Sequence, residues 1–284
     1  MWQWGHSTSK LCSSLTPPTE ATYPAQLVLT HGCRPVPVVA LRPVNQDLMR
    51  RGVAEFIGTF TLIFIGGGAG IVSHSDIVAV GLANGLAIGI MVSNLGHISG
   101  GHFNPAITLG FVSTRRITLR LAVGYWFFQL LGAVSAAFIL RYLFTQTLVK
   151  LGATPAPNTT DAKALILEGI MTFFLVWAVW ATAVDARGTF KAIAGLAIGL
   201  TITIDVFVGG PVTGAAMNPA RAFGPELASN SWTGWWIYWI GPGVGALVAA
   251  LVYEFLYLSP LKPVVVGTPE SGVDEPRPGE TAAS

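Results

Sequence analysis

Charged residues are scarce in this sequence. Of its 284 residues, 16 are Lys or Arg and 14 are Asp or Glu, which together make 11% of the chain. A soluble globular protein draws about a quarter of its residues from these four types. Apolar residues make up 52% instead, and the mean hydropathy is +0.59. This balance excludes most soluble folds and predicts a membrane protein.

Cysteine and clustered positive charge are scarce as well. The two cysteines, Cys12 and Cys33, lie near the start, so the apolar body can hold neither a disulfide nor a thiolate metal site. The net charge is only +2 and no run of Lys and Arg forms a basic patch, which argues against nucleic acid as a partner. No nucleophile and base pair stands in a plausible context, so we expect no enzyme activity, no cofactor and no metal.

Long apolar segments are abundant. A membrane-spanning helix needs about 20 mostly apolar residues to cross a hydrocarbon layer of about 30 Å. Six segments qualify, and they lie near residues 53–72, 77–95, 121–143, 164–184, 190–208 and 235–258. We therefore predict an all-α membrane protein with six transmembrane helices.

Two further apolar segments, 104–112 and 218–228, are too short to span a membrane, and each begins with Asn-Pro. Asn is a favoured helix N-cap, and Pro is favoured as the first helical residue because its missing N–H would have no partner there. The pattern predicts two re-entrant half-helices.

The chain repeats itself after 113 or 114 residues. AEFIGTFTL (54–62) matches LEGIMTFFL (167–175), which aligns Glu55 with Glu168. The tripeptide Asn-Pro-Ala occurs twice in equivalent places, as Asn104, Pro105 and Ala106 and as Asn218, Pro219 and Ala220. Each repeat holds three spans, an odd number, so the second repeat is inverted relative to the first.

The domain organisation follows from the repeat. We predict a first repeat at 49–160 and an inverted second repeat at 161–260, between a disordered arm at 1–48 and a disordered tail at 261–284. Met49 directly precedes the first apolar run and is an alternative start of the protein.

The basic residues predict an orientation. Seven of them fall on the side that the two termini share: Arg50, Arg51, Arg115, Arg116, Arg120, Arg187 and Lys191. That side is expected to be cytoplasmic, since cytoplasmic loops carry an excess of Lys and Arg. We expect a multi-pass protein of the cell membrane.

The two glycine-rich approaches to the short helices predict a pore. Non-helical backbone at membrane depth is tolerated only where it is buried in protein or lines a watery cavity. Its inward carbonyls would form a ladder of acceptors, from Gly100, Gly101, His102, Gly214, Ala216 and Met217. The two helix N-termini each bring about half a positive charge and repel cations. Asn104 and Asn218 can donate carboxamide N–H groups to a passing oxygen.

Three segments and the inverted duplication resemble the aquaporin (major intrinsic protein) family of water and small-solute channels. The segments are GHISGGHFNPAITLG (96–110), GGPVTGAAMNPARAFGP (209–225) and AEFIGTF (54–60). The resemblance covers residues 50–258. It implies a lipid-embedded homotetramer with one pore per subunit, and it assigns Glu55 and Glu168 the role of buried acceptors for loop N–H groups.

The resemblance also places a narrow constriction. Arg221 directly follows the second tripeptide, and an intramembrane Arg needs a functional or paired explanation. The resemblance adds Asn84, Val206 and Ala215 to it. Strict water channels of the family have Phe and His at the first two of these positions, so Asn84 and Val206 predict a wider opening. The pattern is most similar to the branch with vacuolar and ammonia-permeable aquaporins.

We therefore predict a passive water channel that excludes protons and ions, with hydrogen peroxide, ammonia or small polyols as additional neutral permeants. The alternative is an ion-coupled secondary transporter, because carriers also use inverted repeats with broken helices. In that alternative Glu55 and Glu168 would carry protons. Asp205, next to Val206, is expected to be a buried acceptor with its partners satisfied.

Overall fold

The computed structural model describes residues 44–144, 154–187 and 191–258, and all regular secondary structure in this part of the chain is helical. Six helices are long and apolar enough to cross a membrane: Asp47–Val72, Ile77–Ser99, Leu119–Leu143, Asp161–Val184, Ala194–Thr213 and Ile237–Leu258. They confirm the six predicted spans. The predicted tail at 261–284 and most of the predicted arm lie outside the described residues.

The helices of the first half are α1 (Val44–Thr61), the π-helical turn η1 (Leu62–Gly67), α2 (Gly68–Val72), α3 (Ile77–Ser99), α4 (Pro105–Ser113) and α5 (Leu119–Leu143). The helices of the second half are α6 (Asp161–Val179), the π-turn η3 (Trp180–Val184), the 3₁₀ turn η4 (Lys191–Ile193), α7 (Ala194–Thr213), α8 (Pro219–Ser229), α9 (Ile237–Tyr253) and the π-turn η5 (Glu254–Leu258). Because α1 begins at Val44, the last five residues of the expected arm are helical.

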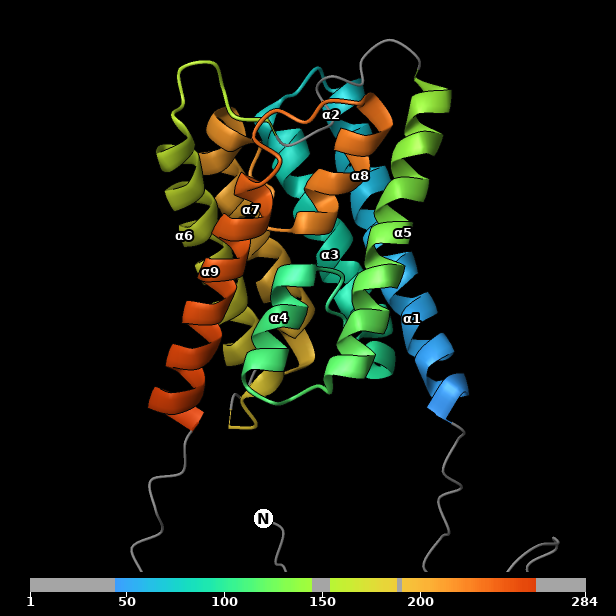
Figure 1. The fold of residues 1–284 in the computed structure, drawn as a ribbon, viewed down its shortest axis with the longest axis vertical. Coiled ribbons are helices and arrows are strands. Elements are labelled where there is room, and N and C mark those ends of the chain that lie inside the picture. The colour runs from blue at the N-terminus through green and yellow to red at the C-terminus, as the bar shows by residue number, and fades with distance from the viewer. Residues whose placement is uncertain (1–43, 145–153, 188–190, 259–284) are drawn as a thin grey trace, which may run out of the picture. The chain divides into compact units, whose positions relative to one another are not determined.

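The two short helices begin where the Asn-Pro pattern predicts. Asn104 caps α4 by accepting a hydrogen bond at Oδ1 from the Ala106 N–H (2.8 Å), and Asn218 caps α8 through the Ala220 N–H (3.0 Å). Figure 1 shows α4 and α8 one above the other among the long helices, with their N-terminal ends toward the middle. A cap of this kind satisfies a backbone donor that the first helical turn leaves without a partner.

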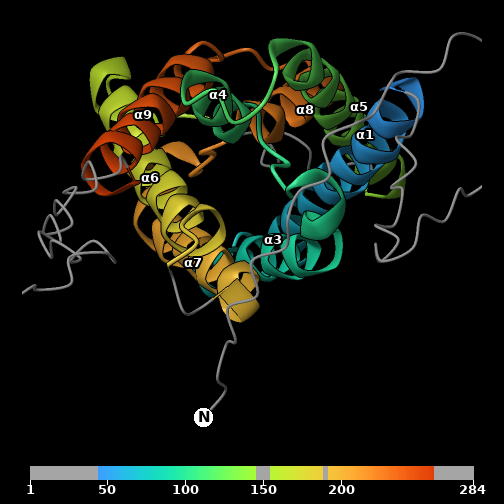
Figure 2. The same ribbon diagram turned by 90° about the horizontal axis from the view of Figure 1, so that it is seen from below.

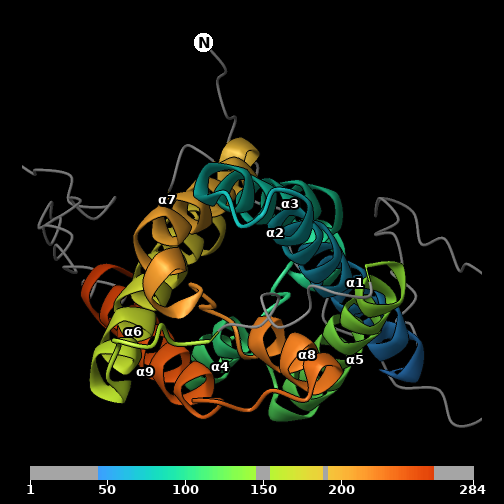
Figure 3. The ribbon, with the colours of Figure 1, turned by 90° about the horizontal axis from the view of Figure 1, so that it is seen from above.

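The six long helices form a ring around this centre. Figures 2 and 3 show the ring from its two ends, with α4 and α8 between α9 and α5. The most extensive pairings are α3 with α7, α6 with α9, and α1 with α5.

Small residues allow the helix backbones to touch. A Cβ atom on Gly85 of α3 would lie 2.4 Å from the Gly199 carbonyl oxygen of α7. A Cβ atom on Gly245 of α9 would lie 2.1 Å from the Gly169 carbonyl oxygen of α6. Such close crossings are typical of helices in membranes, where association depends on backbone packing rather than on burial of apolar surface from water.

The outside of the bundle is apolar. Large exposed apolar side chains occur on all six long helices, for example Ile57, Leu86, Phe127, Ile170, Leu200 and Val248. The buried positions instead hold many alanines and a set of polar side chains that includes Glu55, Asn104, Glu168 and Asn218. This distribution suits a chain whose exterior faces lipid and whose polar groups are gathered inside.

Candidate functional site

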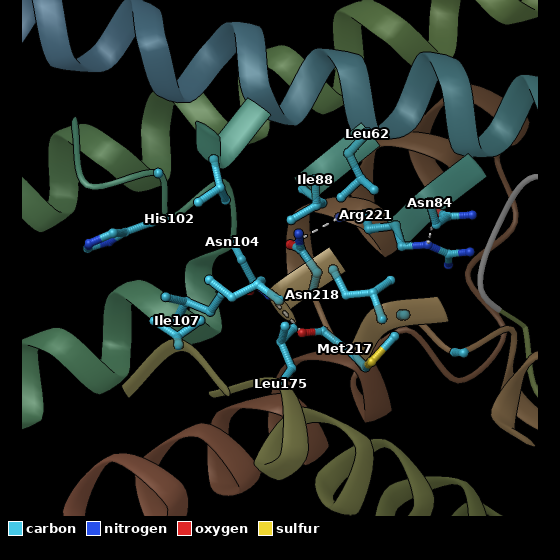
Figure 4. A pocket seen from close by; sticks show the side chains of 17 residues that line it. Leu62, Asn84, Ile88, His102, Asn104, Ile107, Leu175, Met217, Asn218 and Arg221 are labelled. Carbon is cyan, nitrogen blue, oxygen red and sulfur yellow. Dashed lines mark hydrogen bonds between the residues drawn. The ribbon is translucent and has the colours of Figure 1, made fainter. Parts of the chain in front are cut away.

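The two loops that lead into α4 and α8 hold each other at the centre of the bundle. The Asn104 Nδ2–H group donates to the Met217 carbonyl (2.8 Å), and the Asn218 Nδ2–H group donates to the Phe103 carbonyl (2.9 Å). Because an amide nitrogen carries two hydrogens, each Asn keeps one N–H for another partner. Figure 4 shows both side chains beside the same cavity.

Glu55 of α1 fixes the first loop. It is fully buried and its carboxylate accepts from four donors: Ser99 Oγ (2.6 Å), the His102 N–H (3.0 Å), the Phe103 N–H (2.6 Å) and Gln129 Nε2 (2.7 Å). A carboxylate can accept about four hydrogen bonds, so this acceptor is used to capacity.

Glu168 of α6 fixes the second loop in the same way. It is fully buried and accepts from Thr213 Oγ1 (2.6 Å), the Ala216 N–H (2.9 Å) and the Met217 N–H (2.7 Å). Each of these donors lies 114 residues after its counterpart in the first loop, in line with the sequence repeat.

These hydrogen bonds hold a backbone that is costly for residues other than glycine. Phe103, Ala215 and Met217 have positive φ angles of 48°, 47° and 53°. Each left-handed non-glycine residue costs on the order of 1–3 kcal/mol and persists only where its surroundings fix it. The conformation turns the loop carbonyls and N–H groups to opposite sides, so that the N–H groups reach the two glutamates.

A narrow cavity runs past the two Asn residues. The loops contribute Gly101, His102, Ala216 and Met217 to its lining. The long helices contribute apolar side chains, from Leu62, Ile88, Val92, Leu175, Val179, Ile198 and Ile202. The cavity therefore lies between the two loops and the inner faces of the long helices. Two more residues were expected to turn their carbonyls toward the pore. Gly214 lines a second cavity, which is described below, and Gly100 lines neither the first cavity nor the second.

A second cavity meets the first at Arg221, which lines both. Of the other three expected constriction residues, Asn84 and Ala215 line the first cavity and Val206 lines the second. Figure 4 shows Asn84 and Arg221 pointing toward one another, at the opposite end of the cavity from His102.

Asn84 is held from two directions. Its Nδ2 group donates to the Val80 carbonyl (2.8 Å), and its Oδ1 atom accepts from Arg221 Nε (3.4 Å). Among the residues that the structure describes, one of the five N–H groups of the Arg221 guanidinium thus has a hydrogen-bond partner.

The hydrogen bonding of Asp205 differs from the prediction made from the sequence. It is buried, and within the part of the chain that the structure describes its Oδ2 atom has no hydrogen-bond partner. The prediction of a fully satisfied acceptor is therefore wrong for this oxygen. The aspartate precedes Val206 on α7, but it lines neither of the two cavities that meet at Arg221.

Comparison with known proteins decides the family. The sequence model described as "Major intrinsic protein" matches residues 43–253. A probable aquaporin TIP-type alpha of Phaseolus vulgaris is 42% identical over 230 residues, which cover 77% of this chain and 89% of that protein. Nodulin-26 of Glycine max is 41% identical over 218 residues, covering 75% and 80%. The chain belongs to the aquaporin family.

A solved structure agrees with this assignment. The X-ray structure of the aquaglyceroporin from Plasmodium falciparum superposes with a TM-score of 0.65 at 26% identity, covering 73% of this chain and 96% of that one. The predicted resemblance, the all-α fold with six spans and the water-channel function are thereby confirmed. This aquaporin is a multi-pass membrane channel and not an enzyme, and nothing supports the ion-coupled carrier.

Sequence reasoning missed several residues that position the loops in this aquaporin. Tyr125 donates its hydroxyl to the Ser99 carbonyl, and Tyr238 donates to the Thr213 carbonyl (2.7 Å). Both tyrosines lie in aromatic clusters of the sequence, which are typical of side chains that only pack. The signal that could have found them is the repeat itself, because they are aligned at an interval of 113 residues.

Ion pairs lie at the end of the aquaporin where α4 ends. Besides the pairs of Asp47 with Arg50 and Arg51 at the start of α1, two further pairs lie beside η5 and η3. Arg116 donates to both carboxylate oxygens of Glu254 at 2.8 Å, which ties the turn after α4 to η5. Arg187 donates to Asp185 through Nε (3.0 Å) and Nη2 (2.8 Å), and these bonds hold the pKa of Asp185 well below its usual range. That aspartate is therefore ionised across the physiological pH range.

Glu168→Gln tests the loop anchor. A carboxamide has one acceptor oxygen and one NH₂ group, so a donor of the second loop is left facing another donor. A buried donor without a partner costs about 1–3 kcal/mol. We expect a clear fall in the melting temperature of the purified protein, followed by intrinsic tryptophan fluorescence. Asp161→Asn, an acid-to-amide change at an exposed position of the same helix, is the control. Equal melting temperatures for the two variants would contradict the anchoring role.

Proposed function

We propose that water crosses this aquaporin in single file through the central cavity, past Asn104 and Asn218 and through the constriction at Arg221. The reciprocal hydrogen bonds between the two loops support this proposal, because Asn104 and Asn218, which donate them, line the same cavity. The carbonyls of Gly101, His102 and Ala216 would accept hydrogen bonds from water along this path.

Proton exclusion would arise at the centre. The N-termini of α4 and α8 each carry about half a positive charge, and they face each other where the two tripeptides meet. The remaining Nδ2–H groups of Asn104 and Asn218 can both donate to the oxygen of one water molecule. That water then directs its own hydrogens away from the centre on both sides, so no continuous proton wire passes through it.

Selectivity would arise at the junction of the two cavities. The fixed charge of Arg221 repels cations, while its N–H groups replace part of the hydration of a neutral permeant. Val206 and Ala215 are small and apolar, and Asn84 is smaller than an aromatic ring. These side chains favour neutral permeants somewhat larger than water, namely ammonia, hydrogen peroxide and small polyols.

The membrane arrangement follows the same proposal. We infer that α4 and α8 are re-entrant half-helices and that the end of the bundle carrying the start of α1, the end of α9 and Arg115 is cytoplasmic. The working assembly is a homotetramer with one pore per subunit. The sequence predicts that the protein resides in the cell membrane, whereas the TIP-type relatives favour a vacuolar membrane. Imaging of the tagged chain in its own cell distinguishes these locations.

Osmotic shrinkage of proteoliposomes tests the channel. We expect stopped-flow light scattering to show a fast phase that scales with protein content, has a low activation energy and needs no ion gradient. These properties follow from a continuous hydrated path. Protein-free vesicles are the control. A flux that saturates and requires sodium or protons would instead support a carrier.

The double variant Asn84→Phe with Val206→His tests the constriction. The ring and the imidazole fill space and add a hydrogen-bonding group at the junction, so fluxes of solutes larger than water should be lost while water flow is retained. The same vesicles are challenged with ammonia, hydrogen peroxide and glycerol. A solute flux equal to that of the unmodified protein would refute these two residues as determinants of pore width.

A further inference from the structure

The first span changes its winding next to the constriction. Residues Leu62–Gly67 form a single turn of π-helix between α1 and α2, and this turn overlaps the start of the run IGGGAG (65–70). Single π-turns are rare inside α-helices and often occur at functional sites. Gly66, Gly67 and Gly70 line the second cavity, on the side of Arg221 away from the central Asn pair.

Gly66 faces the side chain of Asn84 at very close range. A Cβ atom on this buried glycine would lie 2.3 Å from Asn84 Oδ1, 2.6 Å from Cγ and 2.8 Å from Nδ2. All three distances are shorter than real Cβ contacts. The carboxamide of Asn84 therefore occupies the space that any side chain at position 66 would need.

The position of the carboxamide is fixed by its other contacts. Nδ2 donates to the Val80 carbonyl at 2.8 Å, and Oδ1 faces Arg221 Nε at 3.4 Å. Asn84 itself is buried, with 1% of its surface exposed. The side chain thus lies against the first span and toward Arg221, with no room to move toward Gly66.

We propose that Gly66 is a specificity-determining positioning residue of the pore. Because Gly66 has no side chain, the Asn84 carboxamide can lie against the first span and accept a hydrogen bond from Arg221. This inference rests on the proposed function. Gly66 has no side chain, and it acts through Asn84. Any side chain at position 66 displaces the carboxamide into the junction of the two cavities, which narrows the opening and removes the acceptor from Arg221 Nε.

Gly66→Ala in proteoliposomes is the direct test. We expect osmotic water flow per folded protein to fall by about tenfold, the effect of a modest barrier added to one step of a single-file path. Fluxes of ammonia and glycerol, where the unmodified protein conducts them, should fall further because these solutes are larger than water. An unchanged set of fluxes would overturn the proposal.

One alanine variant in the same glycine run is a matched control. A Cβ atom on Gly68 would lie 3.5 Å from Leu140 Cδ2, which is an ordinary contact, and Gly68 lines neither of the two cavities. Gly68→Ala adds the same methyl group and gains the same helix propensity, so we expect water flow close to that of the unmodified protein. A loss in Gly68→Ala equal to that in Gly66→Ala would overturn the specific role of Gly66.

A double variant separates the action through Asn84 from general packing. Asn84→Ala removes the carboxamide, so adding Gly66→Ala to it should cost no further water flow. If Gly66→Ala alone fails to fold, the double variant should still fold, since the overlapping atoms are gone. A double variant that stays unfolded, or that loses flow as Gly66→Ala does, would overturn the proposal. Absence of water flow in the unmodified protein would overturn the proposed function instead.

Discussion

Each of the two loops at the centre donates one asparagine hydrogen bond to the other loop, and the rest of the structure keeps these two bonds in place. In both Asn104 and Asn218, the carboxamide oxygen accepts a hydrogen bond from the first turn of the helix that the residue caps. One N–H of the same carboxamide donates to a carbonyl of the opposite loop. An asparagine is the shortest side chain that can do both and keep an N–H for a third partner. Replacement by Asp would remove the donors, and replacement by Ser would leave too few.

The two buried glutamates stabilise the irregular backbone of these loops. The loops contain left-handed non-glycine residues and N–H groups that no helix satisfies, both of which are costly inside a bundle without water. Glu55 and Glu168 accept hydrogen bonds from those N–H groups. The carbonyls of Phe103 and Met217 in turn accept a hydrogen bond from the Asn side chain of the opposite loop. The same carboxylates that a proton-coupled carrier could use thus serve as hydrogen-bond acceptors for the loops.

Much of this arrangement could be predicted from the sequence, because each prediction depended on local chemistry or on the repeat. Segment length predicts the six spans, and Asn-Pro predicts where α4 and α8 begin. The constriction was accessible only through resemblance, since Asn84, Val206 and Arg221 are far apart in the chain. In the structure they line two cavities that meet at Arg221.

Other features depend on how helices are rotated against one another, which hydropathy does not encode. The space that Gly66 leaves for Asn84 follows from the π-turn in the first span and its approach to α3. The unpartnered oxygen of Asp205 depends on the packing around α7. Gln129, which serves both Glu55 and Thr108, reads in the sequence as one polar residue in an apolar helix.

The central claim is that two positive helix ends and two asparagine donors meet on one water path and interrupt proton transfer. Its most direct test is the ratio of proton to water permeability in proteoliposomes that enclose a pH-sensitive dye, under an imposed proton gradient with the membrane potential clamped. The account predicts fast osmotic water flow together with a proton flux equal to that of protein-free vesicles. A proton flux that rises in proportion to protein content and to water flow would contradict it.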